Sequence, residues 1–295
     1  MKCGVVTIIG RPNAGKSSLI NALLKTHALI ISPKPQTTRN ALRCIYNDDD
    51  AQIIFTDTPG LYTPNSRDKL GIFLNDSILE ALDDSDCIVW LVDAGTRKLK
   101  PDDYVIAKIL PRKIPVILTA NKSDKSDPTP SFRLYDELFT FADRVAISAR
   151  TKRGLDSLMA ALMPHIPEGE AIYDPDILMD TTEKFVASEI IRGKILMLLR
   201  DEVPHCVAVV VDEYKSPEEY PDRKKLYIRA TLITETEGQK KIIIGSKGEM
   251  IKRIGEESRK AVEEVTGIPA FIDLWVKVVP NWRRNPAALK RLGYA

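Results

Sequence analysis

Short apolar runs alternate with longer segments of helical spacing over residues 2–163. The apolar runs predict strands at 4–9, 41–46, 52–56, 87–93, 115–121 and 144–148. Between them, apolar residues spaced by three or four predict helices at 17–24, 72–82, 103–110, 132–141 and 155–163. Because only residues 47–51 separate the second and third strands, we expect an antiparallel hairpin there. The pattern predicts an α/β domain with a mostly parallel sheet.

The pattern changes after residue 163, where Pro164, Pro167, Gly169 and Pro175 interrupt any regular element. Beyond them we expect a helix at 181–200, strands at 205–211 and 225–234, a helix ending at Ile244, a helix at 250–265 and a strand at 270–279. This order is that of a second, α+β domain. We therefore expect a first domain at 1–166, a linker at 167–180 and a second domain at 181–295.

The composition is that of a folded globular protein, since 44% of the 295 residues are hydrophobic and 28% are charged. This excludes disordered and fibrous classes. No apolar run exceeds six residues, and the first ten residues lack a signal-peptide stretch, so we expect a cytoplasmic protein. The cysteines are far apart and are expected to be reduced core side chains rather than zinc ligands: Cys3, Cys44, Cys87 and Cys206.

Charge is unevenly distributed along the chain. Residues 1–180 hold 22 basic and 24 acidic side chains, whereas residues 181–295 hold 21 and 17. Within the second part, residues 223–295 hold 16 basic against 8 acidic side chains. A local basic excess is what a polyanion senses, so the C-terminal quarter is the candidate for such a partner.

Residues 10–17 form a complete G-x-x-x-x-G-K-S pattern that follows a predicted strand and opens a predicted helix. In such a loop backbone N–H groups face phosphate oxygens, Lys16 adds positive charge at the β and γ phosphates, and Ser17 offers a hydroxyl to Mg²⁺. The nucleotide-binding residues assigned to this loop are Gly10, Arg11, Pro12, Asn13, Ala14, Gly15, Lys16 and Ser17.

A D-x-x-G sequence ends the third predicted strand. The Asp57 carboxylate can hold Mg²⁺ through water, and the Gly60 N–H can reach a γ phosphate. Upstream, in a loop at 32–39, either Thr38 or Thr37 can complete the Mg²⁺ shell, and we favour Thr38; the alternative is a solvated loop. The nucleotide-binding residues here are Asp57, Thr58, Pro59, Gly60 and Leu61, and the catalytic set is Lys16, Thr38, Asp57 and Gly60.

An N-K-x-D sequence ends the predicted strand at 115–121 and identifies the base. The Asp124 carboxylate can accept hydrogen bonds from guanine N1–H and the 2-amino group, a pattern that adenine lacks, and Lys122 can lay its stem over the base. After the next strand, a backbone N–H at 148–149 can meet the guanine oxygen. The base-binding residues are Asn121, Lys122, Ser123, Asp124, Ser148 and Ala149, which favour GTP over ATP.

A G-x-x-G sequence joins two predicted helices in the second domain. Such a loop lets a KH domain bring its backbone close to about four nucleotides. Alone it would be a plain turn, but here the element order matches the second KH type. The RNA-binding residues are Gly245, Ser246, Lys247, Gly248, Lys252 and Arg253. Further on, Trp282 either stacks on a base or packs on the KH helices, and Arg283 and Arg284 can meet phosphates.

The motif order G-x-x-x-x-G-K-S, T-T-R, D-T-P-G, N-K-x-D, S-A and then G-x-x-G resembles the Era family of GTPases over essentially the whole chain. The resemblance implies a P-loop GTPase domain followed by a type II KH domain in a monomeric protein. It also implies Mg²⁺-dependent hydrolysis of GTP to GDP and binding to the 3′ end of 16S ribosomal RNA in maturation of the 30S subunit. Arg150 departs from the pattern, since the family has Leu or Lys after Ser-Ala.

Two features bear on hydrolysis. Ras-type enzymes place a water-orienting glutamine directly after D-x-x-G, where this chain has Leu61, and a hydrophobic side chain cannot polarise water. We therefore expect slow hydrolysis without a partner. The resemblance further implies that Asn13 helps to bind K⁺ beside the phosphates.

Two other classes of function remain open. The first is a GTP-dependent signalling switch in cell-cycle control, peripheral on the inner membrane, which the C-terminal basic charge could support through anionic lipid. The second is an RNA-binding scaffold with a degenerate nucleotide pocket. The intact Lys16, Ser17, Asp57 and Asp124 argue against this scaffold.

Overall fold

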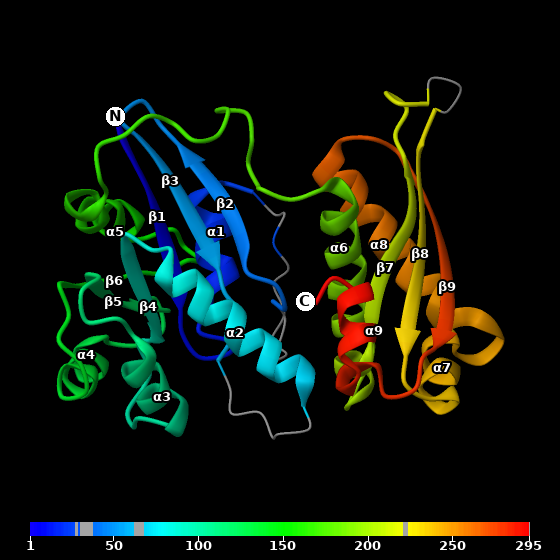
Figure 1. The fold of residues 1–295 in the computed structure, drawn as a ribbon, viewed down its shortest axis with the longest axis horizontal. Coiled ribbons are helices and arrows are strands. Elements are labelled where there is room, and N and C mark those ends of the chain that lie inside the picture. The colour runs from blue at the N-terminus through cyan, green and yellow to red at the C-terminus, as the bar shows by residue number, and fades with distance from the viewer. Residues whose placement is uncertain (27–28, 30–37, 62–67, 221–223, 295) are drawn as a thin grey trace. The chain divides into compact units, whose positions relative to one another are not determined.

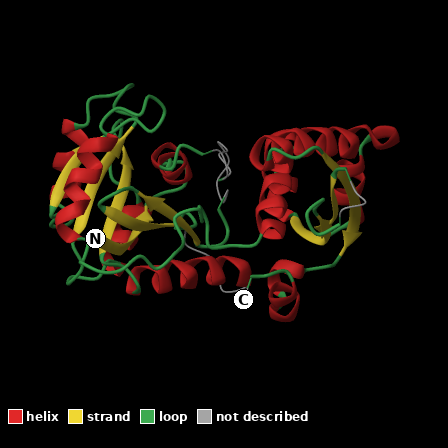
Figure 2. Ribbon diagram, turned by 90° about the horizontal axis from the view of Figure 1, so that it is seen from above, coloured by secondary structure: helices red, strands yellow, loops and turns green. Residues whose placement is uncertain are grey.

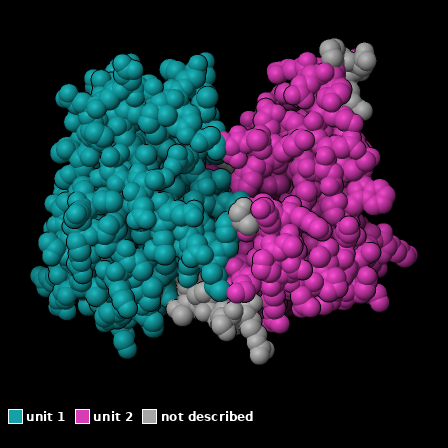
Figure 3. Space-filling view, viewed as in Figure 1, with its two compact units in different colours: residues 1–26, 38–65, 71–180 teal, residues 27–37, 66–70, 181–295 magenta. Residues whose placement is uncertain are grey.

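The computed structural model describes residues 1–26, 29, 38–61, 68–220 and 224–294 (Figure 1). The chain divides into two compact units (Figure 3). Apart from two short segments, the first unit runs to Asp180 and the second begins at Thr181.

A six-stranded sheet forms the centre of the first unit, in the order β2-β3-β1-β4-β5-β6. The β2–β3 pair is antiparallel and the other pairs are parallel, which confirms the predicted mostly parallel sheet with one hairpin. The strands are β1 (Lys2–Ile9), β2 (Leu42–Asn47), β3 (Ala51–Asp57), β4 (Cys87–Asp93), β5 (Val116–Asn121) and β6 (Asp143–Ala146).

Helices lie on both sides of this sheet (Figure 2). They are α1 (Lys16–Leu23), α2 (Lys69–Asp83), α3 (Pro101–Ile109), α4 (Thr129–Asp136), α5 (Leu155–Leu162) and the 3-10 turn η1 (Met163–His165). Helices α2, α3 and α4 enclose a core around Trp90, which is fully buried. Its ring centroid lies 5.3 Å from that of Tyr135 and 5.7 Å from that of Phe141.

Helix α4 is shorter than predicted, because it ends at Asp136 rather than at Phe141. Phe139 and Phe141 are both buried against Trp90. Side chains two residues apart on a helix point about 200° apart, so a helix could not direct both rings into one core. Burial of the two rings therefore overrides the helical spacing that the sequence suggests.

The segment at 167–180, predicted as a linker, is bonded along the first unit. The buried side chain of Gln52 accepts a hydrogen bond from the Ile172 N–H at 2.7 Å. On the edge strand β2, the Ile45 N–H donates to the Leu178 carbonyl at 2.9 Å. The segment thus covers backbone groups of an edge strand that would otherwise be open to pairing.

A three-stranded sheet in the order β7-β8-β9 forms the second unit, with β7–β8 antiparallel and β8–β9 parallel. The strands are β7 (Ala208–Lys215), β8 (Leu226–Thr234) and β9 (Ala270–Val278). The helices are α6 (Glu183–Leu198), α7 (Glu237–Ile244), α8 (Glu249–Thr266) and α9 (Pro286–Arg291), with 3-10 turns η2 (Val203–Cys206), η3 (Ser246–Gly248) and η4 (Trp282–Arg284). Strand β7 begins later than predicted, because η2 occupies the start of the predicted strand.

One face of this sheet meets α6, α7 and α8. On β8 the alternate residues Leu226, Ile228, Ala230 and Leu232 are fully buried in that core. The intervening side chains point to the opposite face of the sheet. The sheet therefore has one core face and one outer face.

Trp282 packs inside the second unit and does not offer its ring to a base. It is fully buried, and its indole Nε1 donates to the Cys206 carbonyl at 3.1 Å. The ring stacks near that of Tyr294, with centroids 5.9 Å apart. Arg283 pairs with Glu235 at 2.6 Å, so this guanidinium already has a protein partner.

The four cysteines are free thiols and all are buried. Burial raises the pKa of Cys87 to about 12, so this thiol stays protonated near neutral pH. Across the parts of the chain that the structure describes, no helix combines the length and apolarity needed to cross a membrane.

Candidate functional site

The predicted nucleotide motifs lie at the carboxyl ends of parallel strands in the first unit. The loop at 10–17 follows β1, residues 57–61 end and follow β3, and residues 121–124 end and follow β5. Carboxyl ends of parallel strands share one edge of a sheet, where ligands of open α/β folds bind. Hydrogen bonds between these loops, described next, bring the motifs together.

Two positions of the loop after β1 require glycine. Gly15 has φ +101°, and a Cβ there would lie 2.3 Å from the Asn121 Nδ2 atom. A Cβ on Gly10 would lie 2.3 Å from the Leu91 carbonyl oxygen. The loop can therefore follow its path against β4 and β5 only without side chains at these positions.

Lys16 begins helix α1, and its side chain turns back into the preceding loop. Its Nζ donates to the Gly10 carbonyl at 3.1 Å and to the Arg11 carbonyl at 3.3 Å. Burial lowers the pKa of Lys16 to about 8, and the negative charge of Asp57 opposes this shift. The ammonium is desolvated, so a phosphate oxygen brought to the loop would stabilise its charged form.

Three side-chain oxygens from different segments converge beside Lys16. The Ser17 Oγ and Thr38 Oγ1 atoms donate to the Asp57 Oδ2 atom at 2.7 and 3.0 Å. The two hydroxyl oxygens lie 3.1 Å apart. Hydroxyl and carboxylate oxygens are ligands that Mg²⁺ prefers, so the donor set suits this ion. Thr37 lies outside the described residues, and the choice of Thr38 over it stays a prediction.

The segment after β3 is fixed to the loop at 10–17. The Thr58 Oγ1 donates to the Ile8 carbonyl at 2.7 Å, and a Cβ on Gly60 would lie 2.8 Å from the Pro12 Cγ. Pro59 lies between these anchored residues. Leu61 is buried in the core with Trp90 and the other apolar side chains of that face. This position therefore offers no polar side chain to orient a water molecule.

Asn121 connects three loops of the site. Its Nδ2 donates to the Ala14 carbonyl at 2.9 Å, while its Oδ1 accepts from the Ala149 N–H at 3.0 Å. The Oδ1 also accepts from the Lys122 N–H at 2.8 Å. Because the Ala149 N–H already has this partner, its contact with the guanine oxygen stays a prediction. The sequence motif alone does not reveal the connecting role of Asn121.

Lys122 reaches from β5 to the phosphate loop. Its Nζ donates to the Asn13 carbonyl at 3.0 Å and to the Asp93 Oδ2 at 2.8 Å. The neighbouring Ser123 N–H donates to the Ile147 carbonyl at 3.0 Å. The stem of Lys122 is thus held in position. Asp93, which ends β4, is a member of the site that the sequence analysis did not identify.

The two oxygens of the Asp124 carboxylate have different partners. The Ser148 hydroxyl donates to Oδ1 at 2.7 Å, and the Arg150 guanidinium donates to Oδ2 at 2.6 Å. The Ser148 hydrogen bond, with Arg150 adding its charge, holds the pKa of Asp124 below its usual range. The carboxylate therefore stays ionised, as an acceptor of two guanine donors must be.

The Arg11 side chain turns away from the phosphate loop. Its Nε lies 3.3 Å from the buried carboxylate of Asp103, and its NH2 group donates to the Thr96 hydroxyl at 3.1 Å. Only the backbone of Arg11 is therefore available to a nucleotide. The adjacent Asn13 is exposed, with φ +63°, at the outer turn of the loop.

The Gly-x-x-Gly loop of the second unit separates α7 from α8. Gly245 has φ +73°, and a Cβ there would lie 2.7 Å from the Met250 Cβ. Gly248 has φ +81°, and a Cβ there would meet nothing within 4 Å. Ser246 and Lys247 between them are exposed. Glycine is therefore needed at 245 for packing against Met250, whereas the space beside Gly248 is open to a ligand.

A groove continues from this loop between α8 and β9. It is lined by Ile251, Lys252, Gly255, Glu256, Arg259, Phe271, Ile272, Asp273 and Leu274. A Cβ on Gly255 would lie 3.7 Å from Leu274, and the Ala270 N–H donates to Glu263 at 2.9 Å. These contacts show that β9 runs antiparallel to α8. The sequence predicts Lys252 but not the β9 side, because no motif marks that strand.

Arg253 belongs to the same turn of α8 as Lys252 but does not line the groove. It is exposed on the helix surface close to the Gly-x-x-Gly loop. Its position is compatible with a contact to phosphate outside the groove.

Comparison with known proteins supports both units. The family described as 50S ribosome-binding GTPase matches residues 5–122, and the KH domain family matches residues 202–283. The GTPase Era of Halothermothrix orenii is 40% identical over 99% of this chain and 98% of its own length.

Two solved structures also match over the full chain at 40% identity. One is an Aquifex aeolicus Era variant bound to GDP·AlF4⁻, with a TM-score of 0.93 and complete coverage of both chains. The other is Era in complex with MgGDPNP and nucleotides 1506–1542 of 16S ribosomal RNA, with a TM-score of 0.92, covering 100% of this chain and 99% of that one. This chain belongs to the Era family: it is a GTPase that hydrolyses GTP, built from a P-loop GTPase domain and a KH domain.

Proposed function

We propose that this protein uses its nucleotide state to control binding of the 3′ end of 16S ribosomal RNA in maturation of the 30S subunit. The observation that carries the proposal is the solved relative that holds MgGDPNP and 16S RNA together and matches this chain over its full length. This chain has both a phosphate loop and a Gly-x-x-Gly loop with an adjoining groove. We assign GTP binding to residues 1–166, the linker to 167–180, and RNA binding to 181–295 in a monomer.

In the nucleotide site, Ser17, Thr38 and Asp57 would hold Mg²⁺, since their oxygens converge within 3.1 Å of one another. The bound ion supplies positive charge that neutralises the phosphates. Lys16 places its ammonium against the β and γ phosphates, and the Gly60 N–H hydrogen-bonds the γ phosphate. The site thus orients the triphosphate by charge and backbone donors.

Water activation is the weak part of this site, because Leu61 is buried and cannot position a water molecule. Hydrolysis by the protein alone is therefore slow. Asn13, at the exposed turn of the phosphate loop, helps to hold K⁺ beside the phosphates. Phosphate release should then be faster in KCl than in NaCl at equal ionic strength, and Asn13→Ala should remove the difference. Equal rates of the wild type in both salts would exclude a role for K⁺.

In the RNA site, the loop at Gly245–Gly248 approaches the sugar-phosphate backbone and the bases enter the groove between α8 and β9. Apolar residues Ile251, Ile272 and Leu274 form part of the lining, and Lys252 offers charge at its edge. Such a site reads single-stranded RNA. The 16S 3′ end supplies the single-stranded partner.

The proposal is tested by the anisotropy of a labelled RNA that carries the 3′-terminal sequence of 16S RNA. A scrambled RNA of equal length is the control for sequence, and liposomes of anionic lipid are the competitor that tests the membrane alternative. We expect tight binding of the 3′-end sequence, weaker binding of the scrambled RNA and no competition by liposomes. Equal binding of both RNAs would contradict the assignment to 16S RNA, and displacement of RNA by liposomes would favour the membrane switch.

A further inference from the structure

The outer face of the KH sheet carries large exposed aromatic side chains. We define the outer face by Tyr227, Arg229, Thr231, Phe271, Asp273 and Trp275, on β8 and β9. Trp275 is 60% exposed and Phe271 is 57% exposed. The other two tryptophans, Trp90 and Trp282, are completely buried. Exposed rings of this size on the same face of one strand, with only Asp273 between them, mark a surface that meets a partner.

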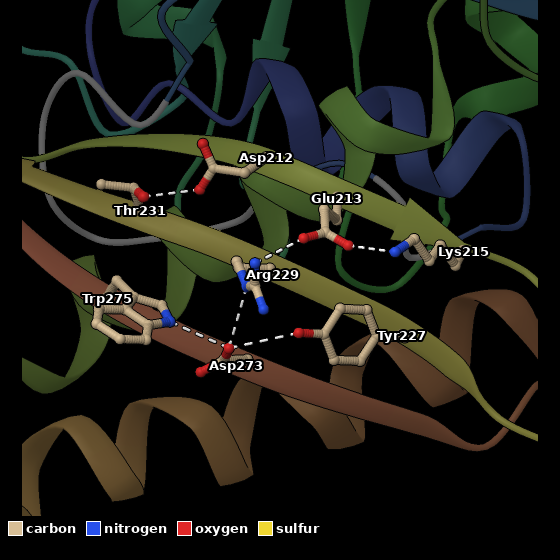
Figure 4. A network of polar contacts seen from close by, with 8 residues as sticks. All are labelled: Asp212, Glu213, Lys215, Tyr227, Arg229, Thr231, Asp273 and Trp275. Carbon is tan, nitrogen blue, oxygen red and sulfur yellow. Dashed lines mark hydrogen bonds and ion pairs between the residues drawn. The ribbon is translucent and has the colours of Figure 1, made fainter.

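Trp275 is exposed and yet held in place (Figure 4). The Asp273 Oδ2 atom accepts from the Trp275 Nε1 at 3.0 Å and from the Arg229 Nε at 3.2 Å. Arg229 is fixed in turn by Glu213 at 2.6 Å on β7. The polar edge of the indole is thus anchored while most of the ring stays open to solvent. An immobilised ring loses little side-chain entropy when a ligand stacks on it.

Phe271 lies against Tyr227 at the corresponding position of β8. The two rings are stacked, with centroids 5.9 Å apart and an interplanar angle of 10°. Lys215 Nζ lies 5.8 Å from the Tyr227 ring and the Arg229 guanidinium carbon lies 5.9 Å from it. Aromatic rings flanked by cations are the surfaces on which proteins stack nucleic-acid bases.

The outer face continues the groove. Phe271 and Asp273 line the groove as well as belonging to the outer face. Strand β9 runs antiparallel to α8, so Phe271 lies at the Arg259 end, away from the Gly-x-x-Gly loop. From Ile251 to Arg259 the helix rises about 12 Å, and a KH loop clamps about four nucleotides. RNA that leaves the groove at this end therefore meets Phe271 first.

Most acidic side chains on the outer face are paired with cations. The carboxylate of Glu213 pairs with Lys215 and Arg229, and that of Asp273 pairs with Arg229. These two carboxylates are thus matched by cations, whereas that of Asp212, also on this face, accepts a hydrogen bond from the Thr231 hydroxyl at 2.7 Å. Stacking is tolerant of sequence and does not need a strongly basic surface.

We propose that single-stranded RNA longer than the groove passes around the edge of β9 and stacks bases on Phe271 and Trp275. The inference rests on the proposed RNA-binding function and adds a second contact surface to it. It predicts that the outer face contributes to binding only when the RNA extends beyond about four nucleotides.

Intrinsic tryptophan fluorescence tests this directly, because Trp275 is the one solvent-exposed tryptophan of the three in the chain. RNA oligonucleotides of four and of ten nucleotides from the 16S 3′ end, both placed to fill the groove, are titrated while anisotropy reports binding. We expect the longer RNA to quench the fluorescence and the shorter RNA to bind without quenching. In Trp275→Phe, which keeps an aromatic ring, the longer RNA should still bind but the quenching should vanish.

Affinity gives the second measurement. Trp275→Ala should weaken binding of the longer RNA by about fivefold or more and leave the shorter RNA unaffected. Tyr104→Ala is the matched control, since Tyr104 is 56% exposed but belongs to the GTPase domain, and it should change neither affinity. If the longer RNA binds with no quenching and Trp275→Ala binds it normally, this inference is wrong while the proposed function stands. If neither RNA binds the wild type, both proposals fail.

Discussion

The nucleotide site and the Gly-x-x-Gly loop differ in how strongly their residues are bonded to the rest of the protein. In the nucleotide site, side chains that would touch the ligand already form hydrogen bonds to other loops, as Asn121 does to the Ala14 carbonyl and the Ala149 N–H. In the RNA loop, Ser246 and Lys247 are exposed and Gly248 faces open space. A change in the first site therefore disturbs several loops, whereas a side chain at Gly248 would meet no protein atom within 4 Å, although its φ of +81° strains residues other than glycine. The following predictions test that contrast.

The largest effect is expected at Asp124, because its carboxylate would accept two charge-assisted hydrogen bonds from guanine. Asp124→Asn should weaken GDP binding by about 100-fold or more and should favour a xanthine nucleotide, whose C2 carbonyl can accept from the new amide. Competition between the two nucleotides for the variant measures this preference.

Asn at this position also removes the charge that pairs with Arg150. Arg150→Ala is therefore the control, since it breaks the same ion pair and keeps the carboxylate. An unchanged preference for guanine in Asp124→Asn would remove Asp124 from base recognition.

At the RNA loop, Gly248→Asp should weaken RNA binding by about 30-fold, because it adds a carboxylate where phosphate approaches and removes a close backbone contact. Hydrolysis of GTP should stay intact. Gly248 suits this test better than Gly245, whose Cβ would lie 2.7 Å from Met250 and would disturb the fold.

Gly248→Asn is the matched control for this charge. It adds a side chain of the same size, and Asn also tolerates a positive φ. A loss as large in Gly248→Asn as in Gly248→Asp would assign the effect to size rather than charge, and normal binding by both would reduce the loop to a plain turn.

Binding of GDP should depend on pH through Lys16. Burial lowers the pKa of Lys16 to about 8, and phosphate would raise it in the complex. Below pH 8 the ammonium is charged before and after binding, so affinity is constant. Above pH 8 the free site loses its proton and binding must take one up, so affinity should fall by about tenfold between pH 7 and pH 9.

Calorimetry in buffers of different ionisation enthalpy should detect the matching proton uptake. Guanosine, which has no phosphate, is the matched ligand, and its affinity should fall much less than that of GDP over this range. A flat profile for GDP would show that Lys16 does not change its protonation on binding.

A smaller effect is expected from Arg150, whose side chain is 70% exposed although it pairs with Asp124. Exposed ion pairs contribute little, so Arg150→Ala should weaken GDP binding by only about two- to fivefold. Arg150→Lys should restore part of the loss at low salt. Loss of affinity as large as that of Asp124→Asn would mean that the ion pair is essential to the site.

The sequence predicted which strand ends carry Lys16, Asp57 and Asp124, and the structure places these residues beside the ends of β1, β3 and β5, whereas their contacts with a nucleotide stay predictions. It could not predict partners that come from elsewhere, such as Asp93 beside Lys122. The helical spacing wrongly predicted that α4 includes Phe139 and Phe141. The helix ends at Asp136, because both rings are buried in the same core. For Trp282, the sequence could not decide between stacking on a base and packing on the KH helices. The complete burial of its side chain in the structure favours packing.

The exposed rings of β9 could not be predicted from the sequence either. Phe271 and Trp275 alternate with half-buried residues of an ordinary strand, and nothing in that pattern distinguishes an exposed ring from a core ring. The Gly-x-x-Gly loop could be recognised from the sequence because its backbone conformation requires glycine. The wall of the groove comes from β9, a strand distant in the sequence, so only the folded structure reveals it.

The central claim is that nucleotide state controls RNA binding, and one measurement tests it most directly. The affinity for the 16S 3′-end RNA is measured with GDP, with a non-hydrolysable GTP analogue and without nucleotide. Coupling between two sites on one chain is commonly fivefold or more, so the account predicts at least about fivefold tighter binding with the analogue than with GDP. Equal affinities in all three states would contradict the account and leave two independent sites on one chain.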